Sequence, residues 1–87
     1  MKYKFEFSKT FNKTFLKLDK LTQKQIQKTI NAFMNDALNC DIKKLKGYND
    51  RYRLRSGDYR IIFSKNNDKL LILFLKLNHR KEVYDNL

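Results

Sequence analysis

The longest apolar run in the chain is Leu70 to Leu75, which contains six residues. A membrane-spanning helix needs roughly 20 residues, so this run is too short to be one. It follows Asn66-Asn67-Asp68, whose side chains favour a turn because they tolerate a left-handed backbone and bond their own main chain. A short apolar run after a turn predicts a strand with both faces covered. We therefore expect a central strand of a sheet over residues 69–77.

Three other segments have the pattern of strands. Residues 2–7 alternate aromatic and charged side chains, which is the period of two expected when one face of a strand is buried. Residues 51–56 and 58–65 are rich in tyrosine, arginine and β-branched residues. Ser56-Gly57-Asp58 joins these two segments and is typical of a tight turn. The sequence therefore predicts one N-terminal strand and three consecutive strands in the C-terminal half.

The segment after the first strand predicts two amphipathic helices. Ser8 can cap the first of them. The apolar face of this helix is formed by Phe11, Phe15 and Leu18. Thr22 and Gln25 fit a capping box for the second helix, which we expect over residues 22–39.

The connection between the helices is short, which predicts an antiparallel helical hairpin. We therefore expect an α+β fold, in which an N-terminal strand and this hairpin precede a three-stranded antiparallel meander. The strands would form a single antiparallel sheet with the helices on one face. Residues 80–86 are expected to form a short terminal helix or turn. A chain of 87 residues has room for one core, so residues 1–87 should be a single domain.

The chain is strongly basic. Its 20 Lys and Arg residues against 9 Asp and Glu residues leave a net charge of +11. Such an excess destabilises the compact state unless an anionic partner offsets it, and nucleic acid is the first candidate. The N-terminus lacks the apolar stretch of a signal peptide, so we expect a cytoplasmic protein without a membrane anchor.

The arginines are the strongest candidates for a site. All five lie in the C-terminal half, whereas the lysines are spread along the chain. Arginine binds phosphate through a two-pronged fork of N–H donors. Side chains alternate along a strand, so Arg53 and Arg55 share one face of the strand over residues 51–56. If Arg60 of the next strand shares this face, the guanidinium groups form a cluster that is costly without an anion.

Further candidates follow the central strand. His79 and Arg80 would lie at the rim of the sheet, and Tyr84 would lie on the same side as Arg80 if this stretch is helical. The simpler alternative is a structural histidine and a tyrosine that packs as a lid. For the arginines, the corresponding alternative is a half-exposed strand with carboxylate partners on the surface. These partners would be Asp50, Asp58 and Glu82.

The sequence contains no motif for a cofactor or a metal. It has only two glycines and therefore no Gly-rich phosphate loop, and it has no HExxH motif or Cys/His cluster. The single cysteine, Cys40, can form no intramolecular disulfide and is expected to be a buried or half-buried filler. With cofactor and metal motifs absent, the chemistry that the sequence still supports is phosphate chemistry carried out by cations and a proton shuttle.

Three segments together resemble a known family. They are Leu45-Lys46-Gly47, residues 52–63 with the sequence YRLRSGDYRIIF, and residues 79–84 with the sequence HRKEVY. This combination resembles the RelE/ParE superfamily of bacterial toxins from toxin–antitoxin systems, and especially the RelE-type mRNA interferases. The resemblance implies a small sheet with an N-terminal helical hairpin. It also implies a metal-independent endoribonuclease that cuts mRNA in the ribosomal A site, inhibits translation and is neutralised by a cognate antitoxin.

The resemblance also implies which residues are catalytic. The positions that match the family are Arg53, Arg55, Arg60, Arg80 and Tyr84. RelE itself has lysines at the first two of these positions. Arginine hardly ever loses its proton, so neither of these two residues is a credible general base. His79 and Tyr84 remain as candidates for the base, and Arg80 or His79 for the group that protonates the leaving 5′-oxygen.

Two alternatives remain beside the nuclease. The ParE branch of the superfamily shares the fold but inhibits DNA gyrase by binding, without nuclease activity. A non-enzymatic RNA-binding module is the third possibility. The retained arginines and Tyr84 favour the ribonuclease.

Overall fold

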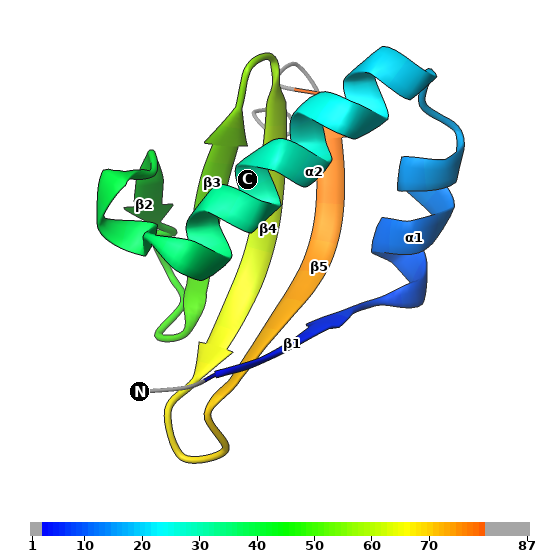
Figure 1. Ribbon diagram of the computed structural model, residues 1–87. Coiled ribbons are helices and arrows are strands. Elements are labelled where there is room, and N and C mark those ends of the chain that lie inside the picture. Colours follow the sequence, from blue (N-terminus) through cyan, green and yellow to red (C-terminus); the bar gives the residue numbers. More distant parts are fainter. Residues whose placement is uncertain (1–2, 80–87) are drawn as a thin grey trace.

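The structure, a computed structural model, describes residues 3–79 of the chain. This part forms one sheet with two helices on one of its faces (Figure 1). The strands are β1 (Lys4–Phe7), β2 (Ile42–Lys44), β3 (Arg51–Ser56), β4 (Tyr59–Asn66) and β5 (Leu71–His79). The helices are α1 (Lys9–Leu16), α2 (Lys20–Asn35) and the short 3-10 helix η1 (Ala37–Asn39). The predicted terminal helix or turn at residues 80–86 lies outside the described residues.

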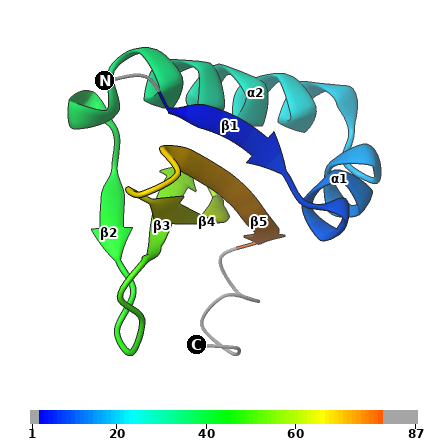
Figure 2. The same cartoon turned by 90° about the horizontal axis from the view of Figure 1, so that it is seen from below.

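The strands follow the order β1-β5-β4-β3-β2 in the sheet. Strands β3, β4 and β5 form the predicted antiparallel meander, and β5 lies between two neighbours, as the apolar run indicated. Both helices lie on one face of the sheet, so the predicted α+β class is confirmed (Figure 2). The prediction of a purely antiparallel sheet was wrong, because β1 pairs with β5 in parallel. A parallel pair needs a long crossover connection, which the helices and the first strands of the meander supply.

The fifth strand, β2, was not predicted. It has only three residues, and its sequence Ile42-Lys43-Lys44 lacks the alternation of a longer strand. It pairs antiparallel with β3, with Ile42 opposite Leu54 and Lys43 opposite Arg53. This segment extends the sheet at its β3 edge.

Helix α2 begins earlier and ends earlier than predicted. Asp19 has extended backbone angles and precedes the first helical residue, Lys20, so Thr22 lies inside the helix. The pKa of the Asp19 carboxyl is lowered, mainly because this carboxyl accepts a hydrogen bond from the Thr22 side chain. Gln25 does not close a capping box, because its side-chain amide donates to the Ser56 carbonyl at 3.0 Å. The end of the predicted helix is replaced by η1.

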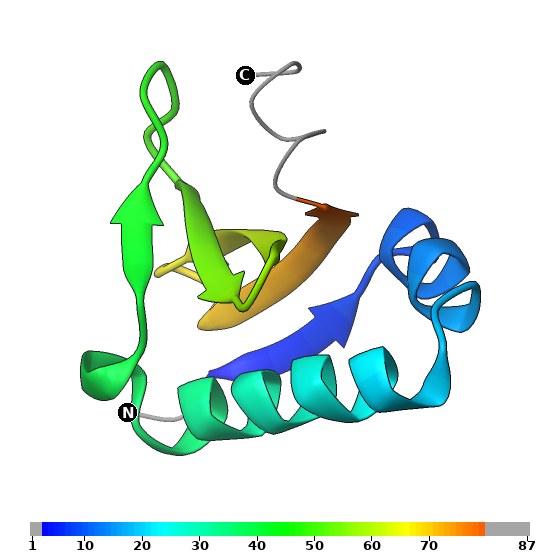
Figure 3. The ribbon, with the colours of Figure 1, turned by 90° about the horizontal axis from the view of Figure 1, so that it is seen from above.

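The two helices reverse the direction of the chain, as a hairpin does, but they spread apart from their connecting turn (Figure 3). Helix α1 contacts β5, whereas α2 crosses the sheet and contacts β3. The ring of Phe11 lies 6.1 Å from that of Phe74, measured between centroids. Each helix therefore packs mainly on the sheet.

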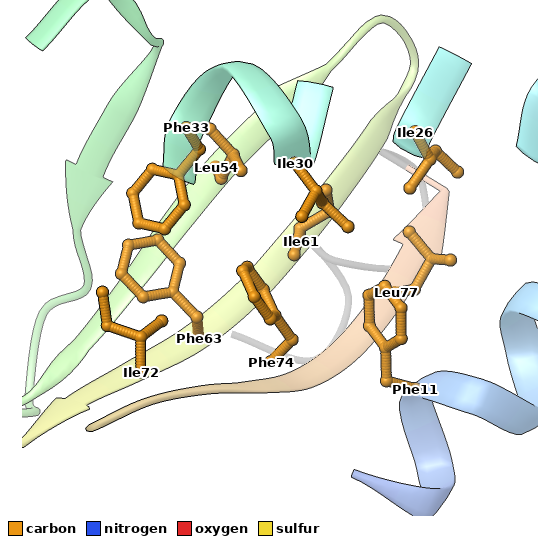
Figure 4. Packing of buried hydrophobic residues seen from close by; sticks show 10 residues of the cluster. All are labelled: Phe11, Ile26, Ile30, Phe33, Leu54, Ile61, Phe63, Ile72, Phe74 and Leu77. Atoms are coloured by element: carbon orange, nitrogen blue, oxygen red, sulfur yellow. The ribbon is translucent and has the colours of Figure 1, made fainter. Parts of the chain in front are cut away.

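The core lies between the two helices and the sheet (Figure 4). Its buried members are Phe11, Ile26, Ile30, Phe33, Leu54, Ile61, Phe63, Ile72, Phe74 and Leu77. Phe74 is completely buried at its centre and lies close to the rings of Phe5, Phe7, Phe11, Phe33 and Phe63. Burial of such large rings is the main stabilising contribution that this small domain has available.

A β-bulge in β5 decides which side chains reach each face. Ile62 pairs with Lys76 and Phe63 pairs with Phe74, so Leu75 is the extra residue. Phe74 and Leu77 are three positions apart, yet the bulge lets both join the core under the helices. The same shift places Asn78, instead of an apolar residue, opposite Arg60.

Ser8 ties this bulge to the start of α1. Its hydroxyl oxygen accepts the Phe11 N–H at 3.0 Å, which is the predicted helix cap. The same hydroxyl donates to the Leu75 carbonyl at 2.7 Å. One side chain thus binds a free helix donor and the carbonyl of the bulged residue. Within residues 3–79, neither helix is long and apolar enough to cross a membrane.

We predict that Ser8→Ala lowers the free energy of unfolding by about 1–2 kcal/mol, because it removes the helix cap and the partner of the Leu75 carbonyl. Urea unfolding followed by circular dichroism measures the change. Thr10→Ala is the matched control on an exposed position of the same helix and should change stability by less than about 0.5 kcal/mol. Equal effects of the two substitutions would contradict this role of Ser8.

Candidate functional site

The pleat of β3 sends its arginines to the face of the sheet opposite α1 and α2, which we call the arginine face. Leu54 and Ser56 point to the helices, because Leu54 is fully buried in the core and the Ser56 hydroxyl lies 2.6 Å from the Thr29 hydroxyl of α2. Side chains alternate along a strand, so Arg53 and Arg55 lie on the opposite face.

Arg60 joins them from β4. It pairs directly with Arg55, and paired residues of an antiparallel ladder point to the same face. Only 3% of Arg60 is exposed, and its Nη1 atom donates to the carbonyls of Gly57 at 3.1 Å and Tyr59 at 3.2 Å. The structure therefore brings Arg53, Arg55 and Arg60 together on one face, and so meets the condition that the sequence left open for Arg60.

The turn that holds Arg60 requires a glycine. Gly57 has a φ of +59°, and a β-carbon there would lie 2.2 Å from the side-chain nitrogen of Gln25. Gln25 approaches so closely because its amide donates to the Ser56 carbonyl. The β3–β4 turn is thus held by α2 on one side and by Arg60 on the other.

Among residues 3–79, the carboxylate that meets the arginines is Asp41, and not Asp50 or Asp58. The third expected partner, Glu82, lies outside the described residues. Its Oδ1 lies 3.1 Å from Nη2 of Arg53, and its Oδ2 lies 3.8 Å from Nη1 of Arg55. Its main-chain carbonyl also accepts the Arg55 N–H at 3.0 Å. Asp41 was not predicted, because this residue reaches β3 only through the unpredicted strand β2.

The arginine face keeps an excess of positive charge despite Asp41. Arg51 lies on the same face of β3, and the register adds Lys43 of β2 beside Arg53. Among the described residues, the Nε–H groups of Arg51, Arg53 and Arg60 are buried without a hydrogen-bond acceptor. An unsatisfied buried donor costs roughly 1–3 kcal/mol. A ligand with several anionic oxygens would supply both charge and acceptors, so this face is suited to bind an oxyanion such as phosphate.

The loop between β2 and β3 contributes an aromatic ring beside this cluster. Gly47 has a φ of +83°, a left-handed conformation that favours glycine. After this turn, the ring of Tyr48 lies under the guanidinium of Arg51, 5.0 Å from ring centroid to Cζ. The Leu45-Lys46-Gly47 motif thus has a structural role in placing Tyr48, which sequence analysis did not single out.

His79 is not brought onto the arginine face. It pairs with Tyr59, and Tyr59 pairs with Ser56, which points to α2. Its ring meets the Tyr59 ring edge-on, with centroids 5.4 Å apart. The bulge in β5 places its neighbour Asn78 opposite Arg60 instead. The other two predicted site residues, Arg80 and Tyr84, lie outside the described residues.

Cys40 is half-buried, as predicted for a filler. Burial, with a smaller effect of Asp36, raises the pKa of its thiol, which donates to the Asp36 carbonyl at 3.5 Å. A protonated thiol is a poor nucleophile. Within the described part of the chain, no three Cys, His, Asp or Glu side chains gather into a metal-binding group.

Comparisons with known proteins show the family of this chain. A family model described as the ParE toxin of the type II toxin–antitoxin system parDE matches residues 5–84. The chain belongs to the RelE/ParE superfamily of type II toxins. Toxin RelE3 of Methanocaldococcus jannaschii is 50% identical to this toxin over 52 residues, which are 60% of this chain and 56% of that protein. The match thus spans little more than half the length of that relative.

Two solved structures support the RelE branch. The archaeal RelE–RelB complex from Pyrococcus horikoshii OT3 matches with a TM-score of 0.75 and 30% identity, over 92% of this toxin and 97% of that chain. The RelB–RelE antitoxin–toxin complex from Methanococcus jannaschii matches with a TM-score of 0.74 and 38% identity, over 93% of this chain and 96% of that chain. The family model carries the ParE name, but these relatives are RelE proteins and favour that branch.

We predict that inorganic phosphate stabilises this toxin through the arginine face. At roughly five times its dissociation constant, a ligand that binds only the native state adds about 1 kcal/mol. Thermal unfolding in phosphate, compared with chloride at equal ionic strength, measures the gain. The double variant Arg53→Gln/Arg55→Gln should lose it, whereas Lys24→Gln/Lys28→Gln on α2 removes the same charge and should keep it. Equal gains in the two variants would indicate general screening and contradict the prediction.

Proposed function

We propose that this toxin is a ribosome-dependent, metal-independent endoribonuclease that cleaves mRNA and so inhibits translation. The observation that carries the proposal is the convergence of Arg53, Arg55 and Arg60 on one face of the sheet. The similarity to RelE proteins, rather than to the ParE branch, supports the same reaction class. A cytoplasmic location follows from this target.

The proposed reaction is an attack of a ribose 2′-OH on the adjacent phosphate. The 2′-oxygen forms a bond to phosphorus, the bond to the 5′-oxygen breaks, and the products are a 2′,3′-cyclic phosphate and a free 5′-OH. Negative charge develops on the phosphorane oxygens in between. Arg53, Arg55 and Arg60 would stabilise it, at roughly 3–4 kcal/mol for each well-placed donor.

The reaction also needs a base for the 2′-OH proton and an acid for the 5′-oxygen. The arginines cannot serve as the base, because they keep their protons. The position of His79 beside Tyr59, on the face opposite Arg60, supports Tyr84 as the base. We assign the acid role to Arg80, because the departing 5′-alkoxide is a strong enough base to take a proton even from a guanidinium.

The ribosome would hold the mRNA in line for this attack, because orientation lowers the barrier that a small site alone cannot overcome. Exposed lysines at intervals of four residues follow both helices and would dock on ribosomal RNA. They are Lys9, Lys13 and Lys17 of the first helical segment and Lys20, Lys24 and Lys28 of α2. Such a contact should weaken steeply with salt.

A cognate antitoxin is the other proposed partner. The solved structures from Pyrococcus horikoshii and Methanococcus jannaschii are complexes of RelE with RelB. A net charge of +11 would attract an acidic segment of such a partner to the same basic surfaces.

A translation extract with a defined mRNA tests the function. We expect cuts at fixed positions within codons, only in the presence of ribosomes, with 2′,3′-cyclic phosphate ends. Arg55→Ala should slow cleavage by about 10²–10³-fold, because it removes one donor to the transition state. Lys69→Ala, in the turn before β5, is a charge-matched control and should remain active.

Two outcomes would contradict the proposal. Intact mRNA together with gyrase-trapped DNA breaks would assign the toxin to the ParE class. Cleavage of the same mRNA without ribosomes would show that the ribosome does not take part.

A further inference from the structure

Asp41 lies on the arginine face in the manner of a bound oxyanion. Each of its two carboxylate oxygens meets a different arginine, with Oδ1 at 3.1 Å from Arg53 and Oδ2 at 3.8 Å from Arg55. Two non-bridging oxygens of a phosphodiester present the same pair of acceptors. The carboxylate thus marks the position between Arg53 and Arg55 where an anion is bound.

We propose that Asp41 is a built-in competitor for RNA phosphate. In the free toxin its carboxylate occupies the position between Arg53 and Arg55, and it leaves when a phosphate of RNA binds there. This inference rests on the proposed function of the arginine face. It adds that the affinity of this face for RNA is limited by a residue of the toxin itself.

The geometry allows Asp41 to leave without disturbing the sheet. Its side chain is 53% exposed, so its ion pairs are surface pairs of small free energy. Its main chain is held independently, because its carbonyl accepts the Arg55 N–H at 3.0 Å. Rotation of the side chain into water would free both guanidinium groups and leave the pairing of β2 with β3 intact.

The two arginines differ in what they would offer to the phosphate. The side chain of Arg53 is 16% exposed and that of Arg55 is 49% exposed. The stronger contact of Asp41, at 3.1 Å, is with the more buried group. A phosphate must therefore displace the carboxylate mainly from Arg53. RNA that the ribosome holds in place has a high effective concentration at the arginine face. It therefore displaces the Asp41 carboxylate more readily than free RNA does.

Binding of a labelled, fully 2′-O-methylated oligonucleotide tests the inference without cleavage. Asp41→Asn should bind this RNA about three- to ten-fold more tightly than the native toxin at low ionic strength. The slope of log K against log salt should stay near that of the native toxin, because the same phosphate contact forms in both complexes once the carboxylate has left. Asp41→Glu keeps the charge and should stay near the native affinity.

Two further variants separate competition from net charge. Asp68→Asn changes the net charge equally in the distant β4–β5 turn and should change affinity by less than about two-fold. In the Arg53→Ala background, Asp41→Asn should lose most of its gain, because the competition takes place at Arg53. Thermal unfolding checks each variant, and Asp41→Ser replaces Asp41→Asn if the latter does not fold.

The outcomes distinguish this inference from the proposed function. If Arg53→Ala weakens RNA binding but Asp41→Asn leaves it unchanged or weakens it, Asp41 is not a competitor and the proposed function stands. If Arg53→Ala leaves RNA binding unchanged, the arginine face does not bind RNA and both proposals fail.

Discussion

The packing of the helix-facing side of β3 against α2 is the interaction on which the arginine face depends. Leu54 is buried in the core, and Ser56 contacts Thr29 and Gln25 of α2. These contacts stabilise the strand, while its other side carries like charges that repel each other. A strand can bear both because its pleat separates the two sets of side chains. Apolar burial on one face thus makes possible a cationic cluster on the other.

The β-bulge at Leu75 connects this arrangement to the N-terminal half of the chain. Ser8 caps α1 and donates to the Leu75 carbonyl, so the first helix and the irregular point of β5 are held by one hydroxyl. The bulge sends Phe74 and Leu77 to the core and places Asn78 opposite Arg60. Bulges commonly redirect side chains next to functional sites, and this one determines what β5 contributes to the arginine face.

Most of the fold and part of the candidate site could be predicted from local patterns. The alternation in β3 was sufficient to place Arg53 and Arg55 together, since side chains two positions apart share a face. Asp41 and Lys43 could not be found in this way, because β2 is too short to show a period. The face of His79 could not be predicted either, because it depends on its pairing with Tyr59 across the sheet.

The sequence by itself determined the α+β class, the order of the two helices and the four longer strands, and the clustering of arginines on β3. These follow from periodicities that nearby residues impose on one another, whatever the rest of the chain does. Only the tertiary structure decided that β1 runs parallel to β5, that Asp41 reaches Arg53 and Arg55, and that His79 and Arg60 lie on different faces of the sheet. Each depends on the register between distant strands, where a shift of one residue moves a side chain to the other face.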